Sequence, residues 1–193
     1  MSDTTSRVSR HVIAVLTTIV VASGSAVAAP VDVDLARDVQ RTVTRYAYFT
    51  VFDDVSVIFH DDEGVVTLVG SVTNPKKKRD LGNRVLSVDG IVDVRNEIEV
   101  LPVSTLDNEL RYRVARAIYG NSAFWPYAAR RHPPIHIVVK RGHVTLTGVA
   151  DTEADRALAR VLASQFGAFS VTNKLTLPGT LAEKLEAQEA VSQ

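Results

Sequence analysis

The chain has 193 residues, of which 46% are hydrophobic and 23% are charged, and its formal net charge is zero. A chain of this length forms one domain or two small ones. The sequence contains no cysteine, which excludes disulfide bonds, thiolate metal sites, a thiol nucleophile and lipid anchoring through an N-terminal cysteine.

The N-terminus has the pattern of a secretory signal peptide. Arg7 and Arg10 precede an apolar run over residues 12–22, and small residues follow, with the sequence AVA at residues 26–28. This order predicts a signal peptide over residues 1–28. An uncleaved anchor helix is the weaker alternative, because the run is shorter than the roughly 20 apolar residues that span a bilayer. We therefore expect the mature protein in an extracytoplasmic compartment, most simply a bacterial periplasm.

Two stretches of the remaining chain repeat one pattern. The earlier copy has the sequence GVVTLVG at residues 64–70, and the later copy has GHVTLTG at residues 142–148. Further along, VRNEI at residues 94–98 matches VTNKL at residues 171–175. The repeat predicts two units of roughly 70 residues each. Units of that size are only marginally stable alone, so we expect them to pack on each other or on a partner.

The first unit is predicted to contain a helix, two strands, a second helix and a last strand. Asp34 is well placed to cap the first helix, and alternating apolar residues predict a β-hairpin over residues 55–68. Asn74 is a good cap for the second helix, with Pro75 in its first turn, and the last strand covers residues 92–100. The predicted inward-facing residues are Leu35, Val39, Val43, Val55, Val57, Phe59, Val66, Leu68, Leu81, Val85, Val88, Val92, Val94, Ile98 and Val100.

The second unit repeats this order, so the predicted fold class is α+β, with two tandem small α/β sandwiches. Asp107 is a plausible cap for its first helix, its hairpin covers residues 135–146, and Asp151 or Thr152 caps its second helix. The last strand covers residues 169–177. The predicted inward-facing residues are Leu110, Val114, Ile118, Ile135, Ile137, Val139, Val144, Leu146, Leu158, Leu162, Phe166, Phe169, Val171, Leu175 and Leu177.

Asn96 and Asn173 occupy equivalent positions on the inward faces of the two last strands. A buried amide must be hydrogen-bonded. Both asparagines are therefore predicted to bind backbone groups, at a bulge in the strand, and to have no catalytic role.

The pattern G-x-V-x-L-x-G, a helix and G-x-x-x-V-x-N-x-[IL], present twice, resembles that of tandem BON-domain proteins such as the family of the osmotically inducible periplasmic protein Y. The domains then cover residues 31–103 and 106–178, and residues 179–193 form a helical or disordered tail. The resemblance implies a periplasmic location, a role in envelope integrity under osmotic or other stress, and binding to anionic phospholipid membranes. It carries over no catalytic site, because the matching residues are structural: Gly64, Gly70, Gly90, Asn96, Gly142, Gly148, Gly167 and Asn173.

The charges are divided unevenly between the two units. Residues 30–103 contain 9 basic and 13 acidic side chains, a net charge of −4, whereas residues 104–193 contain 11 and 8, a net charge of +3. An anionic partner is therefore expected to bind the second unit. The modest excess and the secretory signal argue against nucleic acid as that partner.

The two copies differ most between the first helix and the first strand, where the second unit has 17 positions instead of 12. Within this insertion, Phe124, Trp125 and Tyr127 are candidates for contact with the interfacial region of a membrane. Arg130 and Arg131 are candidates for binding lipid phosphates. The alternative is that the aromatic side chains cover the sheet or the contact between the copies, since most large aromatics are largely buried. Further cations that the sequence offers for the same role are Arg111, Arg113, Lys140 and Arg141.

No motif in the sequence carries catalysis or a cofactor. His132, His136 and His143 have no carboxylate motif beside them, so a metal site is not expected. We expect a non-enzymatic protein that binds anionic phospholipid membrane surfaces. The alternative is a protein-binding adaptor or chaperone-like helper for envelope proteins, which would use a strand edge or the contact between the units.

Overall fold

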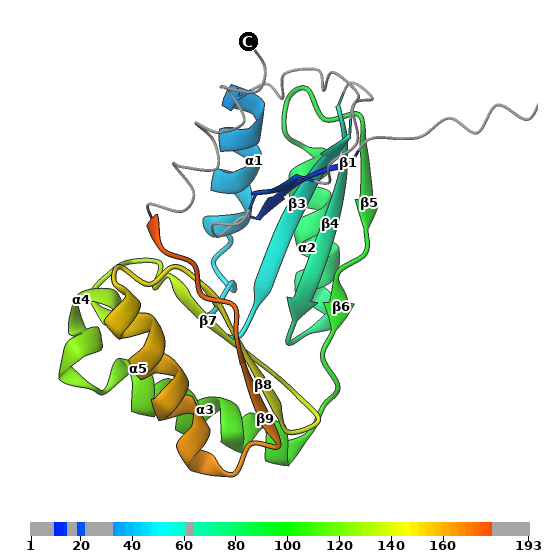
Figure 1. The fold of residues 1–193 in the computed structure, drawn as a ribbon. Coiled ribbons are helices and arrows are strands. Elements are labelled where there is room, and N and C mark those ends of the chain that lie inside the picture. Colours follow the sequence, from blue (N-terminus) through cyan, green and yellow to red (C-terminus); the bar gives the residue numbers. More distant parts are fainter. Residues whose placement is uncertain (1–9, 15–18, 22–32, 61–63, 179–193) are drawn as a thin grey trace, which may run out of the picture.

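A computed structural model describes residues 10–14, 19–21, 33–60 and 64–178. The predicted tail, residues 179–193, lies outside these ranges. The described chain forms two units that each place two longer helices against one face of a small sheet (Figure 1). The predicted α+β class and the order helix, strand, strand, helix, strand are confirmed in both units.

The first unit has a sheet in which β3 is antiparallel to β4, and β4 is parallel to both β5 and β6. The helices α1 and α2 cover the face of this sheet that carries the predicted inward residues of the hairpin. The elements are α1 (Val33–Thr44), β3 (Asp54–His60), β4 (Val65–Val72), α2 (Pro75–Leu86), β5 (Asp93–Asn96) and β6 (Glu99–Val100).

The second unit has the same topology, with β7 antiparallel to β8 and β8 parallel to β9. Its insertion folds into a short 3-10 helix and a single-turn helix, which lie beyond the end of α3 (Figure 1). The elements are α3 (Thr105–Tyr119), η1 (Ser122–Phe124), α4 (Trp125–Ala128), β7 (Ile135–Lys140), β8 (His143–Gly148), α5 (Glu153–Ala163), η2 (Ser164–Phe166) and β9 (Ser170–Asn173).

Part of the predicted signal peptide forms two strands in this structure. β1 (Arg10–Ala14) is antiparallel to β3 and to β2 (Ile19–Val21), so it extends the sheet of the first unit beyond β3. Cleavage after residue 28 stays a prediction, and it would leave β3 at the edge of the sheet. None of the helices among the described residues is long and apolar enough to cross a membrane.

The inward faces follow the predicted pattern with two exceptions. Val92 and Phe169, predicted to face inward, are 74% and 80% exposed. Both residues precede their strands, where the chain crosses the hairpin turn: the amides of Val92 and Phe169 donate to the carbonyl oxygens of Gly64 and Gly142, each at 2.8 Å. Strand alternation therefore does not apply to these two positions.

Of the four predicted helix caps, two are confirmed, and Asp34 instead lies within the first turn of α1. Asn74 accepts a hydrogen bond from the amide of Lys76 at 2.7 Å, and Thr152 accepts one from the amide of Asp155 at 3.0 Å. The assignment of Asp107 was wrong, because Ser104 caps α3 by accepting from the Asp107 amide at 3.2 Å. Asp107 instead lies in the first turn of α3 and binds the hairpin turn described below.

The roles predicted for the two asparagines are confirmed. The Asn96 amide nitrogen donates to the Lys78 carbonyl oxygen in α2 at 2.7 Å, and its oxygen accepts from the Ile98 amide at 3.3 Å. Asn173 makes the equivalent bonds to Arg156 and Leu175, at 2.8 and 3.1 Å. Each asparagine thus ties the second helix of its unit to the point where the last strand breaks.

The motif glycines lie at turns whose backbone conformation would be strained with any other residue. Gly64, Gly70, Gly90, Gly142, Gly148 and Gly167 all have positive φ. At Gly70 and Gly148 a side chain is also excluded by space, because an added Cβ would lie 2.2 Å from the Asp54 carbonyl oxygen or 1.9 Å from the Pro134 carbonyl oxygen.

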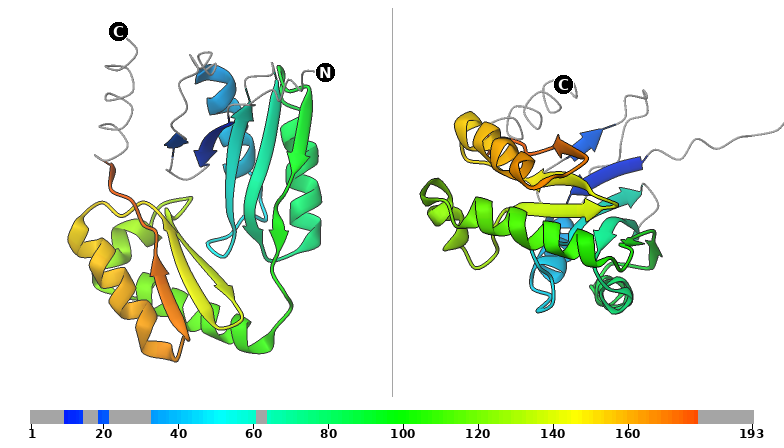
Figure 2. Two further views of the ribbon diagram at one scale, coloured as in Figure 1. Left: turned by 45° about the vertical axis from the view of Figure 1, so that its right-hand side comes forward. Right: turned by 90° about the horizontal axis from the view of Figure 1, so that it is seen from below.

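The two units contact each other along a seam between the segment before β3 and the strand β7 (Figure 2). The Val51 carbonyl oxygen accepts a hydrogen bond from the Ile137 amide at 2.7 Å. Phe52 packs against the core of the second unit, with its ring 5.2 Å from that of Tyr112. The expectation that two small units pack together is met here by a few specific contacts.

Candidate functional site

The aromatic insertion of the second unit is only partly at the surface. Phe124 is completely buried and Tyr127 is 2% exposed, with their rings 5.3 Å apart in the core. The Tyr127 hydroxyl donates to the Asp155 carboxylate at 2.8 Å and accepts from the Asp151 amide at 2.7 Å. Burial raises the pKa of this hydroxyl to about 12. The placement of Phe124 and Tyr127 on a membrane-facing surface was therefore wrong.

Trp125 is the one aromatic side chain of the candidate cluster that points outward, and it is 65% exposed. Arg130 is engaged within the unit, because it pairs with Asp151 at 2.6 Å and its guanidinium lies 5.1 Å from the centre of the Tyr127 ring. Arg131 is exposed and lines a cavity at the seam. The structure thus separates the five predicted residues into two core residues and three surface residues with different surroundings.

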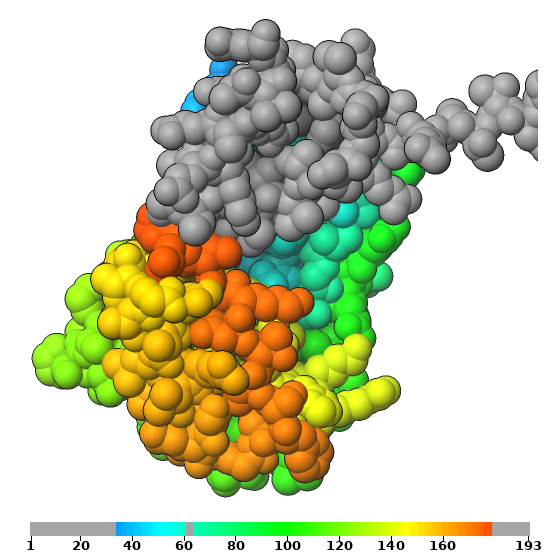
Figure 3. Space-filling model, in the orientation of Figure 1, coloured from blue at the N-terminus to red at the C-terminus, as the bar shows by residue number. Residues whose placement is uncertain are grey.

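A second surface of this unit brings exposed apolar side chains together with cations, and we call it the apolar-basic patch. It consists of Leu106 and Arg113 from α3, Arg141 from the turn between β7 and β8, and Phe169 before β9. Leu106 and Phe169 are 77% and 80% exposed. The four residues line a hollow of about 440 Å³, and Glu109, the ion-pair partner of Arg113, lines it as well. In Figure 3 the turn (yellow) and the segment before β9 (orange) lie side by side on the surface.

The patch is held by Asp107, which is 3% exposed. Its two carboxylate oxygens accept hydrogen bonds from the amides of Arg141 and Gly142, each at 2.8 Å. These bonds fix the turn in which Arg141 has a φ of 51°. Among the residues that the structure covers, the Arg141 guanidinium has no ion-pair partner, so its charge is available to a ligand.

The other cations suggested by the sequence differ in their availability. Arg113 is exposed and pairs with Glu109 of the same helix at 3.2 Å, an exposed ion pair of the kind that contributes little. Lys140 pairs with Glu99 across the seam at 2.6 Å. Arg111 is 3% exposed and donates to the Val139 carbonyl oxygen at 2.6 Å. Burial lowers the pKa of Arg111, and the charge of Asp107 opposes that shift. Arg111 is therefore a core residue and no lipid contact.

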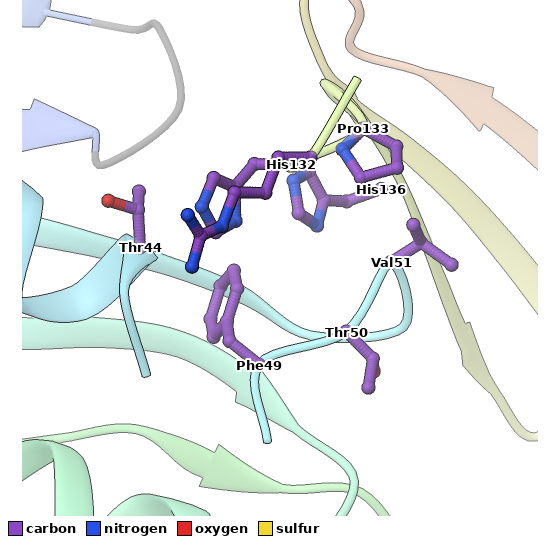
Figure 4. A pocket seen from close by; sticks show the side chains of 8 residues that line it. Thr44, Phe49, Thr50, Val51, His132, Pro133 and His136 are labelled. Carbon is purple, nitrogen blue, oxygen red and sulfur yellow. The ribbon is translucent and has the colours of Figure 1, made fainter. Parts of the chain in front are cut away.

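The seam contains a cavity of about 300 Å³, the seam cavity, to which both units contribute. Its wall includes Phe49, Val51, Arg131, His132, Pro133 and His136. Figure 4 shows the side chains of Phe49, His132 and His136 around one shared space. His136 is 3% exposed. Burial lowers its pKa and the Asp54 charge opposes that shift, while burial raises the pKa of Asp54 itself.

The glycines of the repeat motif lie at turns with positive φ in both units. A family model described as "BON domain" matches residues 31–102 and again residues 107–179. The chain belongs to the BON-domain family. BON domains are associated with phospholipid binding and with the cell envelope, and the family is generally non-enzymatic.

Two solved structures show distant similarity to this chain. Two structures of CdsD, a structural protein of the type III secretion system of Chlamydia trachomatis, match with 16% sequence identity. The first covers 80% of this chain and 98% of its own, with a TM-score of 0.30. The second, the C-terminal domain, covers 77% and 99%, with a TM-score of 0.29. A search of curated proteins finds no match.

The apolar-basic patch belongs to the second BON domain alone. The residue equivalent to Phe169 in the first BON domain is Val92, and the residue before the turn glycine, Arg141 in the second domain, is Glu63 in the first. The sequence that ends at the first of these glycines is Asp-Asp-Glu-Gly, whereas that at the second is Lys-Arg-Gly. The sequence before this glycine is therefore acidic in one copy and basic in the other.

Sequence reasoning missed this patch for a specific reason. Strand alternation predicts that Phe169 faces inward, and no pattern in the sequence singles out Leu106. The opposite charges of the two segments before the turn glycines are the available signal, because a charge reversal between two copies of one fold is not required by the fold and points to a different partner. The described residues contain no cluster of three or more histidine, aspartate or glutamate side chains that would hold a metal ion.

Proposed function

We propose that this BON-domain protein binds the surface of anionic phospholipid membranes through the apolar-basic patch of its second domain. The observation that carries the proposal is the exposure of Leu106 and Phe169, at 77% and 80%, beside the cations Arg113 and Arg141. Large exposed apolar side chains rimmed by polar ones mark interaction sites. The proposed setting is the periplasm, with a role in envelope integrity under osmotic or other stress.

Two kinds of force favour a membrane surface as the partner. Transfer of a Leu or Phe side chain out of water contributes about 1.5–3 kcal/mol when the side chain is fully buried. Each Lys or Arg near an anionic membrane contributes about 1 kcal/mol, and salt weakens this term. The patch offers two apolar and two basic side chains, which supports reversible and salt-sensitive binding. Trp125 is a separate candidate, since α4 lies beyond the opposite end of α3 from Leu106 (Figure 1).

Vesicle flotation of the mature protein, isolated from the periplasm, tests the proposal. N-terminal sequencing of the same sample checks the predicted cleavage after residue 28. We expect co-flotation with vesicles that contain phosphatidylglycerol but not with pure phosphatidylcholine, and a decrease as salt rises. The double variant Leu106→Ser, Phe169→Ser should lose binding. Arg141→Glu should lose it as well, and this change installs the residue that the first domain has at that position.

The repeat supplies the matched control. Val92→Ser removes an equally exposed apolar side chain from the equivalent position of the first domain and should leave flotation unchanged. Absence of flotation with every lipid would reject membrane binding and direct attention to protein partners. Loss of flotation in Trp125→Ala but not in the patch variants would show that the membrane contact lies at α4 instead.

A further inference from the structure

The seam cavity has the composition of a binding site for a small molecule. Its volume of about 300 Å³ is at the lower end of the range for ligand pockets, roughly 300–1,000 Å³. Phe49, Val51 and Pro133 supply apolar wall, and Arg131, His132 and His136 supply hydrogen-bond donors. The wall comes from both domains, with Phe49 and Val51 in the first and the other four residues in the second.

His136 is a buried polar side chain in the wall of this cavity, and its ring nitrogens make no hydrogen bond of ordinary geometry within the described part of the chain. Neither of its ring nitrogens makes a hydrogen bond with any residue that the structure describes, although the side chain is only 3% exposed. The carbonyl groups of Thr50 and Asp53 and the carboxylate of Asp54 lie near the ring without completing such a bond. Buried polar groups are nearly always hydrogen-bonded, and an imidazole carries at least one N–H donor in any protonation state. The cavity beside the ring is therefore a place where a ligand atom would fit.

The charges around the cavity favour an anion. Arg131 is exposed and has no ion-pair partner within the described ranges. His132 lies next to it, and no carboxylate side chain lines the cavity. Asp54 and Asp53 interact with His136, but burial is the larger effect and lowers its pKa, so the neutral imidazole would offer the anion one N–H donor.

We propose that the seam cavity binds a small organic anion, a carboxylate or a phosphate monoester with a short apolar chain. The anionic group binds Arg131 and His136, and the apolar chain contacts Phe49, Val51 and Pro133. This site is distinct from the apolar-basic patch and does not depend on membrane binding. Because both domains form it, the ligand stabilises their docked arrangement by mass action.

Calorimetric titration of the full mature protein with hexanoate and with hexyl phosphate tests the site. We expect one binding site for at least one of these anions and none for hexanol or hexylamine, which share the chain and lack the negative charge. Removing one charged hydrogen-bond partner weakens binding by about tenfold or more, so Arg131→Ala should show that loss. Arg131 is exposed, and this change should not disturb folding.

Arg116→Ala is the matched control, because Arg116 is an exposed arginine of the same domain that does not line the cavity. It should bind the anion as the wild type does. The imidazole nitrogen resonances of His136 should shift on titration, while those of the exposed His143 should not. Absence of binding by both anions, or equal binding by Arg131→Ala and the wild type, would overturn the proposal.

Discussion

At the scale of single residues, the two copies of the motif use the same side chains for the same bonds. Asn96 and Asn173 each bond a helix carbonyl oxygen and a strand amide. Gly70 and Gly148 each lie where a backbone carbonyl oxygen excludes a Cβ atom. The motif residues are therefore needed for the backbone conformation of the fold. Residues with a functional role are expected among the positions at which the two copies differ.

Replacement of a motif glycine by alanine should cost different amounts of stability at different positions. Gly148→Ala should destabilise the second domain by more than about 3 kcal/mol, because the new Cβ would lie 1.9 Å from the Pro134 carbonyl oxygen in addition to the strain of positive φ. Gly167→Ala should cost only about 1–2 kcal/mol, because its φ is 74° and no atom lies within 4 Å of the added Cβ. Urea unfolding followed by circular dichroism measures both. Equal losses would show that backbone strain alone determines the cost.

The sequence predicted correctly those residues whose role follows from the local pattern. The predictions were wrong for residues whose burial depends on tertiary contacts. The positions of Asn96 and Asn173 follow from strand parity, and their backbone bonds were predicted correctly. The burial of Phe124 and Tyr127 depends on how the insertion folds back onto the core. Nothing in the spacing of three aromatic residues shows which one points outward. The exposed Phe169 depends in the same way on the chain crossing the hairpin turn.

At the scale of elements, the start of α2 shows how one lysine of a run of cations stabilises the fold through a buried ion pair. The sequence has four cations from Lys76 to Arg79, where the helix dipole disfavours positive charge. In the structure Lys77 binds Asp53 at 2.6 Å, and their side chains are only 12% and 0% exposed. Asp53 also accepts hydrogen bonds from the amides of Thr50 and Thr73, at 2.8 and 2.9 Å. The ion pair thus joins α2 to the segment that forms the seam.

Lys77→Ala should therefore destabilise the protein far more than loss of a surface lysine would. Breaking a buried ion pair from one side typically costs 3–5 kcal/mol, and we expect about 3 kcal/mol because Asp53 keeps its other hydrogen-bond donors. The exposed neighbour Arg79 is the control, and Arg79→Ala should change stability by less than about 0.5 kcal/mol. Denaturant unfolding of the two variants checks the difference. Similar midpoints would show that the Lys77 contact contributes no more than a solvated charge.

At the scale of the whole molecule, one fold is used twice with opposite surface charge. The domains share their topology and their motif residues, yet residues 30–103 have a net charge of −4 and residues 104–193 a net charge of +3. The repeat and the fold were accessible from the sequence because periodicity and turn residues specify them. The contact between the two units could not be predicted from the sequence. Its residue pairs, such as Val51 with Ile137 and Phe52 with Tyr112, are not equivalent positions of the repeat.

The seam gives the last prediction, which concerns the coupling of the domains. Phe52 belongs to the first domain but packs against the core of the second, next to the hydrogen bond from the Ile137 amide to the Val51 carbonyl oxygen. Phe52→Ala should weaken this docking, so the Ile137 amide should exchange with solvent about tenfold faster or more, equivalent to at least about 1.4 kcal/mol.

Hydrogen exchange measured by NMR reports this change at a single amide. The Leu146 amide, inside the sheet of the second domain, should keep its protection, because Phe52→Ala leaves that sheet paired. Tyr48→Ala is the matched variant, since Tyr48 precedes the same segment and is 60% exposed, and it should leave the Ile137 amide unchanged. If Phe52→Ala accelerates both amides equally, the second domain unfolds as a whole and Phe52 stabilises its core. If only the Ile137 amide responds, the seam opens independently of the two folded domains.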